Sequence, residues 1–168
     1  MILGYGLAQW FVGLVLLQRL VELAIARRNT RALLAAGGVE HGAGHYPAMV
    51  ALHGAWLAAL ALAVGPETKV DPGWFAAYLA VQPLRAWTMA SLGRFWTTRI
   101  ITLPGATPVR AGPYRWLRHP NYVVVALELA LAPLALGLWG IAAAATIANA
   151  AMMRVRLAAE AAALRQYG

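Results

Sequence analysis

Apolar stretches long enough to cross a lipid bilayer occupy most of this 168-residue chain. We find them at about residues 2–26, 46–64, 74–92, 122–136 and 141–163. An α-helix rises about 1.5 Å per residue, so about 20 apolar residues cross the hydrocarbon core. Charged residues make up only 12% of the sequence, about half the usual share in a soluble domain. The sequence therefore predicts an all-α integral membrane protein with about five transmembrane helices, folded as a single domain over residues 1–168.

The basic residues indicate how these helices are oriented. The chain has 14 Lys and Arg and a formal net charge of +8. With five spans and the N-terminus outside, 11 of the 14 fall on the inner side, in segments 27–45 and 93–121 and the C-terminal turns. Basic residues gather on the cytoplasmic side of membrane proteins. We expect a bacterial inner-membrane protein with a cytoplasmic C-terminus that contacts membrane lipids and no nucleic acid.

Several kinds of site are excluded or disfavoured by the sequence. Cysteine is absent, which excludes disulfides, thiolate metal sites and cysteine nucleophiles. His41 and His45 have helical spacing, but they lie in a glycine-rich segment without an H-E-x-x-H pattern, so we expect no metal site. The glycine-rich phosphate-binding motifs and the G-x-S-x-G nucleophile motif are also absent.

Ionisable residues interrupt the predicted spans. An ionisable side chain at the bilayer centre costs roughly 2.5–3.5 kcal/mol on insertion scales, so each such residue needs an explanation. Arg19 and Glu22 are three residues apart, and they either form an ion pair or line a polar cavity. Glu128 has no partner nearby in sequence, and Arg85 from another helix is a candidate. His53 is more typical of a packed histidine than of a ligand.

The densest cluster of polar and aromatic residues is the segment 111–122, AGPYRWLRHPNY, which predicts a turn followed by a helix start. Arg118 can bind a carboxylate through two hydrogen bonds. His119 and Tyr122 can donate hydrogen bonds, and Tyr114 with the nearby tryptophans offers faces for a flat ring or a cation. A ligand with a carboxylate, a positive centre and a heteroaromatic ring, such as S-adenosylmethionine, matches this set. A loop that contacts lipid headgroups is the alternative.

A second constellation lies in the last helix. Asn149, Met153, Arg156 and Glu160 are spaced by four, three and four residues, so they share one helix face. Arg156 and Glu160 have the spacing of an ion pair within a helix. A carboxylate at this position could bind ribose hydroxyls or transfer a proton, and a solvated helix end would have a similar pattern.

The sequence GPYRWLRHPNY, followed by Glu128, Asn149 and the tail RVRLAAEAAALRQYG, resembles the isoprenylcysteine carboxyl methyltransferase family. These are integral membrane methyltransferases with a GPYxxxRHPxYxG core and an RxRxEE-type C-terminal helix. The resemblance covers residues from about 93 to 168 well. Upstream, QRLVELAIARRN and HYPAMVALHGAW are similar to short bacterial members associated with type III polyketide synthases, which are thought to methylate hydroxyls of alkylpyrones.

This resemblance implies an S-adenosylmethionine site between the cytosolic 109–122 loop and the end of the last helix. It carries cofactor binding over to Tyr114, Arg118, His119, Pro120, Tyr122, Arg156 and Glu160. We expect the catalytic residues to be Glu160 together with Arg85 or Glu128, either of which could contact the acceptor head group. The expected acceptor is a lipophilic alkylpyrone-type hydroxyl or a prenylated, isoprenylcysteine-type carboxylate.

Two positions depart from the family pattern. Val124 stands where the core has its last glycine, and Ala159 stands where the tail has its first glutamate. If that glutamate served as a base, this chain needs another base or an acceptor that is already ionised. Two further functions remain open: a non-enzymatic membrane scaffold, and a transporter subunit with Arg19, Glu22 and Glu128 along a polar path. The oligomeric state is not readable.

Overall fold

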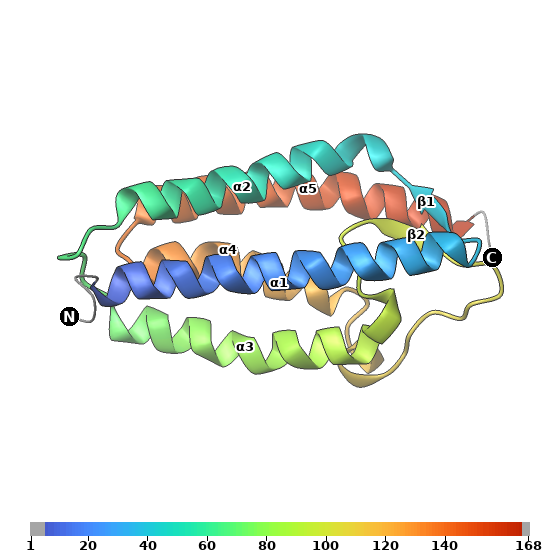
Figure 1. The fold of residues 1–168 in the computed structure, drawn as a ribbon, viewed down its shortest axis with the longest axis horizontal. Helices are drawn as coiled ribbons and strands as arrows, with labels where there is room; N and C mark the ends of the chain where they lie inside the picture. The colour runs from blue at the N-terminus through green and yellow to red at the C-terminus, as the bar shows by residue number, and fades with distance from the viewer. Residues whose placement is uncertain (1–5, 166–168) are drawn as a thin grey trace.

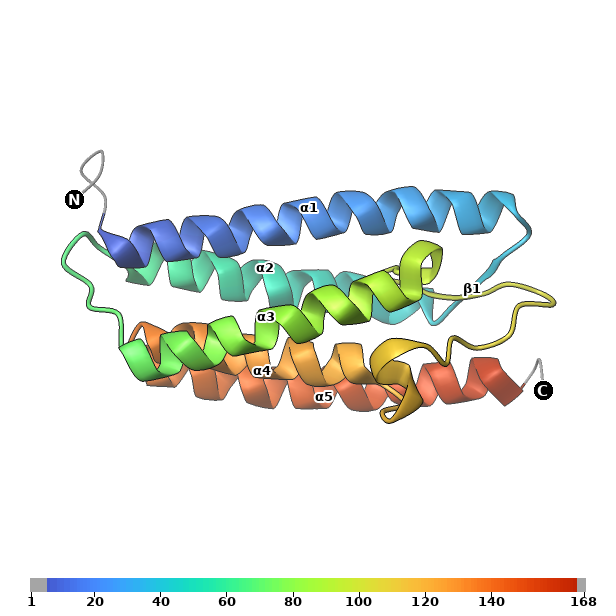
Figure 2. The same cartoon turned by 90° about the horizontal axis from the view of Figure 1, so that it is seen from below.

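The computed structural model describes residues 6–165, which form five long α-helices lying side by side (Figure 1, Figure 2). They are α1 Leu7–Ala35, α2 Tyr46–Ala63, α3 Pro72–Leu92, α4 Pro120–Ala135 and α5 Trp139–Arg165. The connections hold the short elements β1 Val39–His41, η1 Ala43–His45, η2 Gly93–Phe95, β2 Ile100–Thr102 and η3 Gly112–Arg115. The predicted helical fold is confirmed, although residues 2–5 of the first predicted span lie outside the described residues.

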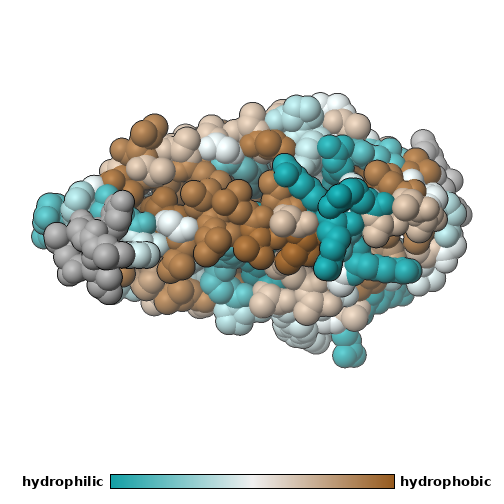
Figure 3. All heavy atoms as spheres, viewed as in Figure 1, coloured by the Kyte–Doolittle hydropathy of each residue, from teal (hydrophilic) through white to brown (hydrophobic). Residues whose placement is uncertain are grey.

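Three of the described helical segments are long and apolar enough to cross a membrane: Leu7–Ala35, Ala43–Ala63 and Trp139–Ala163. Pro120–Ala135 is a shorter apolar helix beside them. In α1, the residues from Leu7 to Ala26 rise about 30 Å, and the arginines begin directly after them. A surface view has an apolar band over the middle of the molecule and hydrophilic side chains toward the C-terminal end of α1 (Figure 3). The chain is an integral membrane protein.

Two predicted boundaries differ from the structure. The polar segment 27–45 was expected to be a loop, but α1 continues to Ala35. Pro83 was expected to kink or break its helix, and α3 nevertheless runs unbroken to Leu92. The start of α3 is well defined because Asp71 Oδ1 accepts a hydrogen bond from the Trp74 N–H (2.9 Å) and Pro72 occupies the first helical position.

The five helices form a ring. Helix α2 packs between α1 and α5, and α4 packs between α5 and α3. Polar side chains join α3 back to α1, because Gln18 donates a hydrogen bond to Gln82 (3.0 Å) and Arg85 contacts Glu22. The bundle has a turn end, with the short connections 64–71 and 136–138, and a loop end, with segments 36–45 and 93–119.

A small sheet at the loop end was not expected from the sequence. Strands β1 and β2 pair antiparallel, with Glu40 opposite Ile101. Arg99 forms a salt bridge with Glu40 (2.5 Å) and lies over the Tyr46 ring at 4.0 Å. Both strands contact α5. The sheet therefore ties the two long connections to each other and to the last helix.

A hydrophobic core fills the turn-end half of the ring. Phe11 meets Phe75 and Tyr78 edge to face, with ring centroids 5.1 and 5.0 Å apart. Leu60 of α2 and Leu129 of α4 are fully or almost fully buried against this cluster. The core holds the helices together at one end and leaves the other half free for polar groups.

Candidate active site

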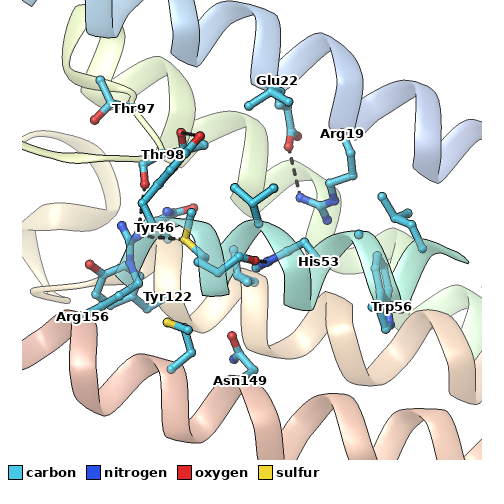
Figure 4. Close-up of a pocket in the computed structure, with 18 of the residues that line it drawn as sticks. Arg19, Glu22, Tyr46, His53, Trp56, Thr97, Thr98, Tyr122, Asn149 and Arg156 are labelled. Atoms are coloured by element: carbon cyan, nitrogen blue, oxygen red, sulfur yellow. Dashed lines mark hydrogen bonds and ion pairs between the residues drawn. The ribbon is translucent and has the colours of Figure 1, made fainter. Parts of the chain in front are cut away.

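A cavity of about 260 Å³ lies inside the loop-end half of the ring, and all five helices contribute to its wall (Figure 4). Its lining residues are Arg19, Leu20, Glu22, Leu23, Tyr46, Met49, Val50, His53, Gly54, Trp56, Leu57, Arg85, Trp96, Thr97, Thr98, Asn121, Tyr122, Val125, Asn149, Met152, Met153 and Arg156. Most of this wall is apolar. The polar groups concentrate at its two ends, near Arg19 on one side and Arg156 on the other.

Several buried polar atoms of the lining residues have no hydrogen-bond partner within residues 6–165. They are Arg19 Nε, Trp56 Nε1, Trp96 Nε1, Asn121 Oδ1 and Asn149 Oδ1. Buried polar groups in folded proteins are nearly always paired with protein or water. Donors and acceptors left open around one cavity are therefore suited to a ligand that carries polar groups of its own.

An ion cluster closes the cavity toward the hydrophobic core. Arg19 contacts Glu22 (3.1 Å) and Glu128 (2.6 Å), and Arg85 contacts the same two carboxylates. Gln82 donates a further hydrogen bond to Glu128 (3.0 Å). Two arginines and two glutamates balance in charge, which allows them to remain ionised in a low-dielectric interior. The predicted Arg85 partner of Glu128 is confirmed, and Arg19 and Glu22 both form an ion pair and line the cavity.

The opposite end of the cavity is formed by Arg156 and Tyr122. Arg156 Nη1 donates hydrogen bonds to the Thr98 carbonyl oxygen (3.1 Å) and to Met49 Sδ (2.8 Å), and its guanidinium lies 5.6 Å from the centre of the Tyr122 ring. The Tyr122 hydroxyl donates to Glu160 Oε2 (2.9 Å). The expected pairing of Arg156 with Glu160 is wrong: in the described structure each binds other partners, because the β2 connection reaches Arg156 first.

Four of the predicted cofactor residues meet just outside this end of the cavity. His119 stacks on Tyr122 with centroids 5.2 Å apart, and its Nδ1 lies 3.6 Å from Glu160. Tyr114 lies near the same carboxylate, and burial, with a smaller contribution from Glu160, raises the pKa of its hydroxyl. Pro120 is buried and begins α4. The motif and the tail, separate in sequence, thus form one cluster.

Arg118 lies apart from this cluster. Its side chain is exposed and does not line the cavity. It forms no ion pair with any residue in the described part of the chain. An arginine free of protein partners is available to a ligand carboxylate from the water side.

The glycine of the GPY motif permits a close approach between its loop and α3. Gly112 has a φ of +56°, and a Cβ atom built on it would lie 2.0 Å from Ser91 Oγ and 2.9 Å from Trp87 Nε1. Trp87 also packs edge to face on Trp116, with centroids 5.8 Å apart. Only glycine combines this backbone conformation with this contact, and the contact fixes the motif loop on the bundle.

The two departures from the family pattern have structural explanations. Val124 is fully buried in α4, where a larger side chain than glycine fills the interior. Ala159 lies against the turn before α2: a Cβ atom built on Gly42 would be 3.1 Å from the Ala159 Cβ. A glutamate at position 159 would have to displace that turn, so the missing carboxylate is replaced by packing.

Sequence reasoning missed several cavity residues. Met49, His53 and Trp56 are spaced by four and three residues, a helical periodicity that could have identified this face of α2. Thr98 contacts Arg156 through its backbone carbonyl, and no sequence signal marks a backbone group. Asn149, Met153 and Arg156 were predicted to share a face, and all of them line the cavity.

Comparison with known proteins identifies the family. Residues 74–166 match the sequence profile of the isoprenylcysteine carboxyl methyltransferase (ICMT) family. The chain is also 36% identical over 160 residues to the uncharacterized protein YpbQ of Bacillus subtilis (strain 168), an alignment that covers 93% of this chain and 95% of that protein. No solved structure matches the chain significantly. On both grounds, this chain belongs to the isoprenylcysteine carboxyl methyltransferase family.

Proposed function

We propose that this membrane methyltransferase transfers a methyl group from S-adenosylmethionine to an oxygen of a lipophilic acceptor. The proposed acceptor is an alkylpyrone-type hydroxyl or an isoprenylcysteine-type carboxylate. One observation carries the proposal: a single cavity joins the family motif residues Tyr122 and Arg156 to an apolar wall within the bundle. An enzyme that brings a water-soluble cofactor to an oily acceptor needs both kinds of surface in one place.

The residues at the loop end suit S-adenosylmethionine. When bound, this cofactor supplies a methyl group activated by a sulfonium. Arg118, exposed and free of ion pairs within residues 6–165, is the proposed partner of its carboxylate. Glu160, held by the Tyr122 hydroxyl, is a proposed acceptor for amino or ribose groups, and the stacked rings of His119 and Tyr122 offer a face for a flat ring. The unpaired Asn121 Oδ1 is a further acceptor.

The acceptor tail is proposed to enter between α1 and α2. Leu20 and Val50 both line the cavity, yet their side chains are 55% and 46% exposed on the lipid-facing surface. An apolar opening of this kind lets a hydrocarbon chain lie partly in the bilayer while its head group stays in the cavity. Exclusion of water from the cavity strengthens the attraction between an acceptor oxyanion and a cationic cofactor.

Arg85 and Glu128 are proposed to serve the acceptor end of the site in different ways. Arg85 lines the cavity and can contact a head group directly. Glu128 is fully buried and does not line the cavity, so its role is to position Arg19 and Arg85. We also propose that all five helices form one domain in a bacterial inner membrane, with the arginine-rich loop end in the cytoplasm, because that side receives 11 of the 14 basic residues.

The test is calorimetric titration of detergent-purified protein with S-adenosylmethionine. We expect Arg118→Ala to abolish binding and Arg156→Ala to weaken it at least about tenfold, since each loses hydrogen bonds to a charged group or its supporting loop. Arg94→Ala is the matched control, because Arg94 lies on Phe95 at the same end of the bundle and outside the cavity. Undiminished binding in both cavity variants would contradict the proposed site, and no binding by the wild type would contradict the function.

A further inference from the structure

His53 is a titratable group of the cavity that the proposed chemistry does not yet use. It lies on α2, and its Nδ1 is 2.9 Å from the carbonyl oxygen of Met49, one helical turn earlier. A carbonyl oxygen can only accept, so Nδ1 carries the proton of this hydrogen bond. In the neutral ring, Nε2 therefore keeps a lone pair. Because Nδ1 is held against the backbone of α2, Nε2 is the nitrogen directed away from it, on the side chain that lines the cavity.

The position of His53 along the cavity is intermediate between its two polar ends. Met49, whose carbonyl binds His53, also contacts Arg156 through its sulfur (2.8 Å). Arg156 belongs to the proposed cofactor end, and the ion cluster with Arg19 closes the other end. Figure 4 places His53 between Arg156 and Arg19. An acceptor head group that reaches from the ion cluster toward the cofactor has to pass this ring.

The chain also lacks a carboxylate at the position where the family tail has its first glutamate. Ala159 occupies that position and packs on the turn at Gly42. Glu160 lies outside the cavity and accepts a hydrogen bond from Tyr122. Glu22 lines the cavity, but both of its oxygens are bound by arginines. Within residues 6–165, His53 is thus the cavity side chain with an uncommitted basic atom.

We propose that His53 is the general base of this enzyme, an inference that rests on the proposed methyltransferase function. His53 Nε2 takes the proton of the acceptor hydroxyl as the acceptor oxygen bonds to the methyl carbon. The carbon–sulfur bond breaks in the same step, and its electron pair remains on sulfur, which becomes a neutral thioether. The imidazolium then releases the proton to water. An acceptor that arrives already ionised needs no such help.

The test compares His53→Asn with the wild type on two long-chain acceptors. Asparagine can still donate to the Met49 carbonyl, so it preserves the local hydrogen bond and removes only Nε2. The first acceptor is an alkylphenol, whose hydroxyl has a pKa near 10 and stays protonated at neutral pH. The second is an alkyl 4-hydroxypyrone, whose acidic enol is largely ionised there. His45→Asn is the matched control, since His45 lies just before α2 and outside the cavity.

We expect His53→Asn to lose roughly 100-fold or more in kcat on the phenol and much less on the hydroxypyrone. The wild-type rate on the phenol should rise with pH through one ionisation that the variant lacks. The charged and titratable groups around the ring are Arg19 and Glu22 of α1, Arg85 of α3, Tyr122 of α4 and Arg156 of α5. Equal rates in variant and wild type, or equal losses on both acceptors without a change in the pH profile, would overturn the proposal.

A second readout does not depend on turnover. In protein labelled with ¹⁵N at its histidine rings, the His53 signals are those missing from His53→Asn. We expect them to have the pattern of a neutral ring protonated at Nδ1, and to shift when the alkylphenol is added without cofactor. A ring protonated at Nε2, or one indifferent to the phenol, would overturn the proposal. If wild-type protein binds no S-adenosylmethionine and methylates neither acceptor, the proposed function fails first.

Discussion

The two halves of the helix ring are built from the same five helices and differ in what fills them. The turn-end half is packed with aromatic and aliphatic side chains around Phe11, Leu60 and Leu129. The loop-end half holds a cavity, the ion cluster and unpaired polar atoms. Glu128 lies one residue from Leu129 and marks the border between them. The comparison indicates that one half provides the stability that the other half gives up for a binding site.

The ion cluster is the part of the loop-end half that most resembles a core. We expect Glu128→Ala to destabilise the protein by about 3–5 kcal/mol, because it leaves Arg19 and Arg85 buried with a single carboxylate. The double variant Arg19→Leu/Glu128→Leu restores neutrality and should recover much of this loss. The measurement is reversible unfolding in mixed detergent micelles.

Leu60→Ala is the counterpart in the turn-end half. It should destabilise by about 2–5 kcal/mol through a cavity in the core and leave S-adenosylmethionine affinity unchanged in the folded protein. Wild-type stability of Glu128→Ala would mean that the ion cluster contributes nothing to the fold, and the division of the molecule into a stabilising half and a binding half would sharpen further.

The contact of the motif loop with α3 gives a prediction of intermediate size. Gly112→Ala should be destabilised by more than the roughly 1–2 kcal/mol that a left-handed backbone costs alanine, since its Cβ also meets Ser91 and Trp87. Gly105→Ala is the control, because Gly105 has a φ of +76° and open space around its Cβ. Cofactor titration and unfolding of both variants measure the difference. Equal effects would mean that the close approach at Gly112 is unimportant.

Two buried tyrosines provide the smallest expected effects and opposite signs. Tyr122→Phe removes the hydrogen bond to Glu160 and should weaken S-adenosylmethionine binding by about 1 kcal/mol. Tyr78→Phe removes a core hydroxyl that has no partner within the described residues, so its stability should be unchanged or slightly higher. Thermal unfolding and calorimetry on both proteins check this pair. A Tyr78→Phe variant that loses stability would show that the turn-end half also depends on polar contacts.

Some features of the site could be predicted because they depend on local spacing. The faces of α1 and α5 follow from helical periodicity, so the Arg19–Glu22 pair and the joint position of Asn149, Met153 and Arg156 were readable. The partner of Arg156 was not, because the Thr98 carbonyl reaches it from a distant connection. The β1–β2 sheet escaped notice because each strand has only three residues, too short for a periodic pattern.

The sequence by itself determined the membrane class, the helices and the family, because hydropathy, helical spacing and a dense motif act over short stretches of chain. Only the tertiary structure decided which helices meet around the cavity, that two arginines share two glutamates, and that Arg118 remains on the surface. It also placed His53 between the two polar ends of the cavity. Such pairings depend on the packing of segments far apart in sequence, and the energy of each contact is fixed only when burial and partner are both known.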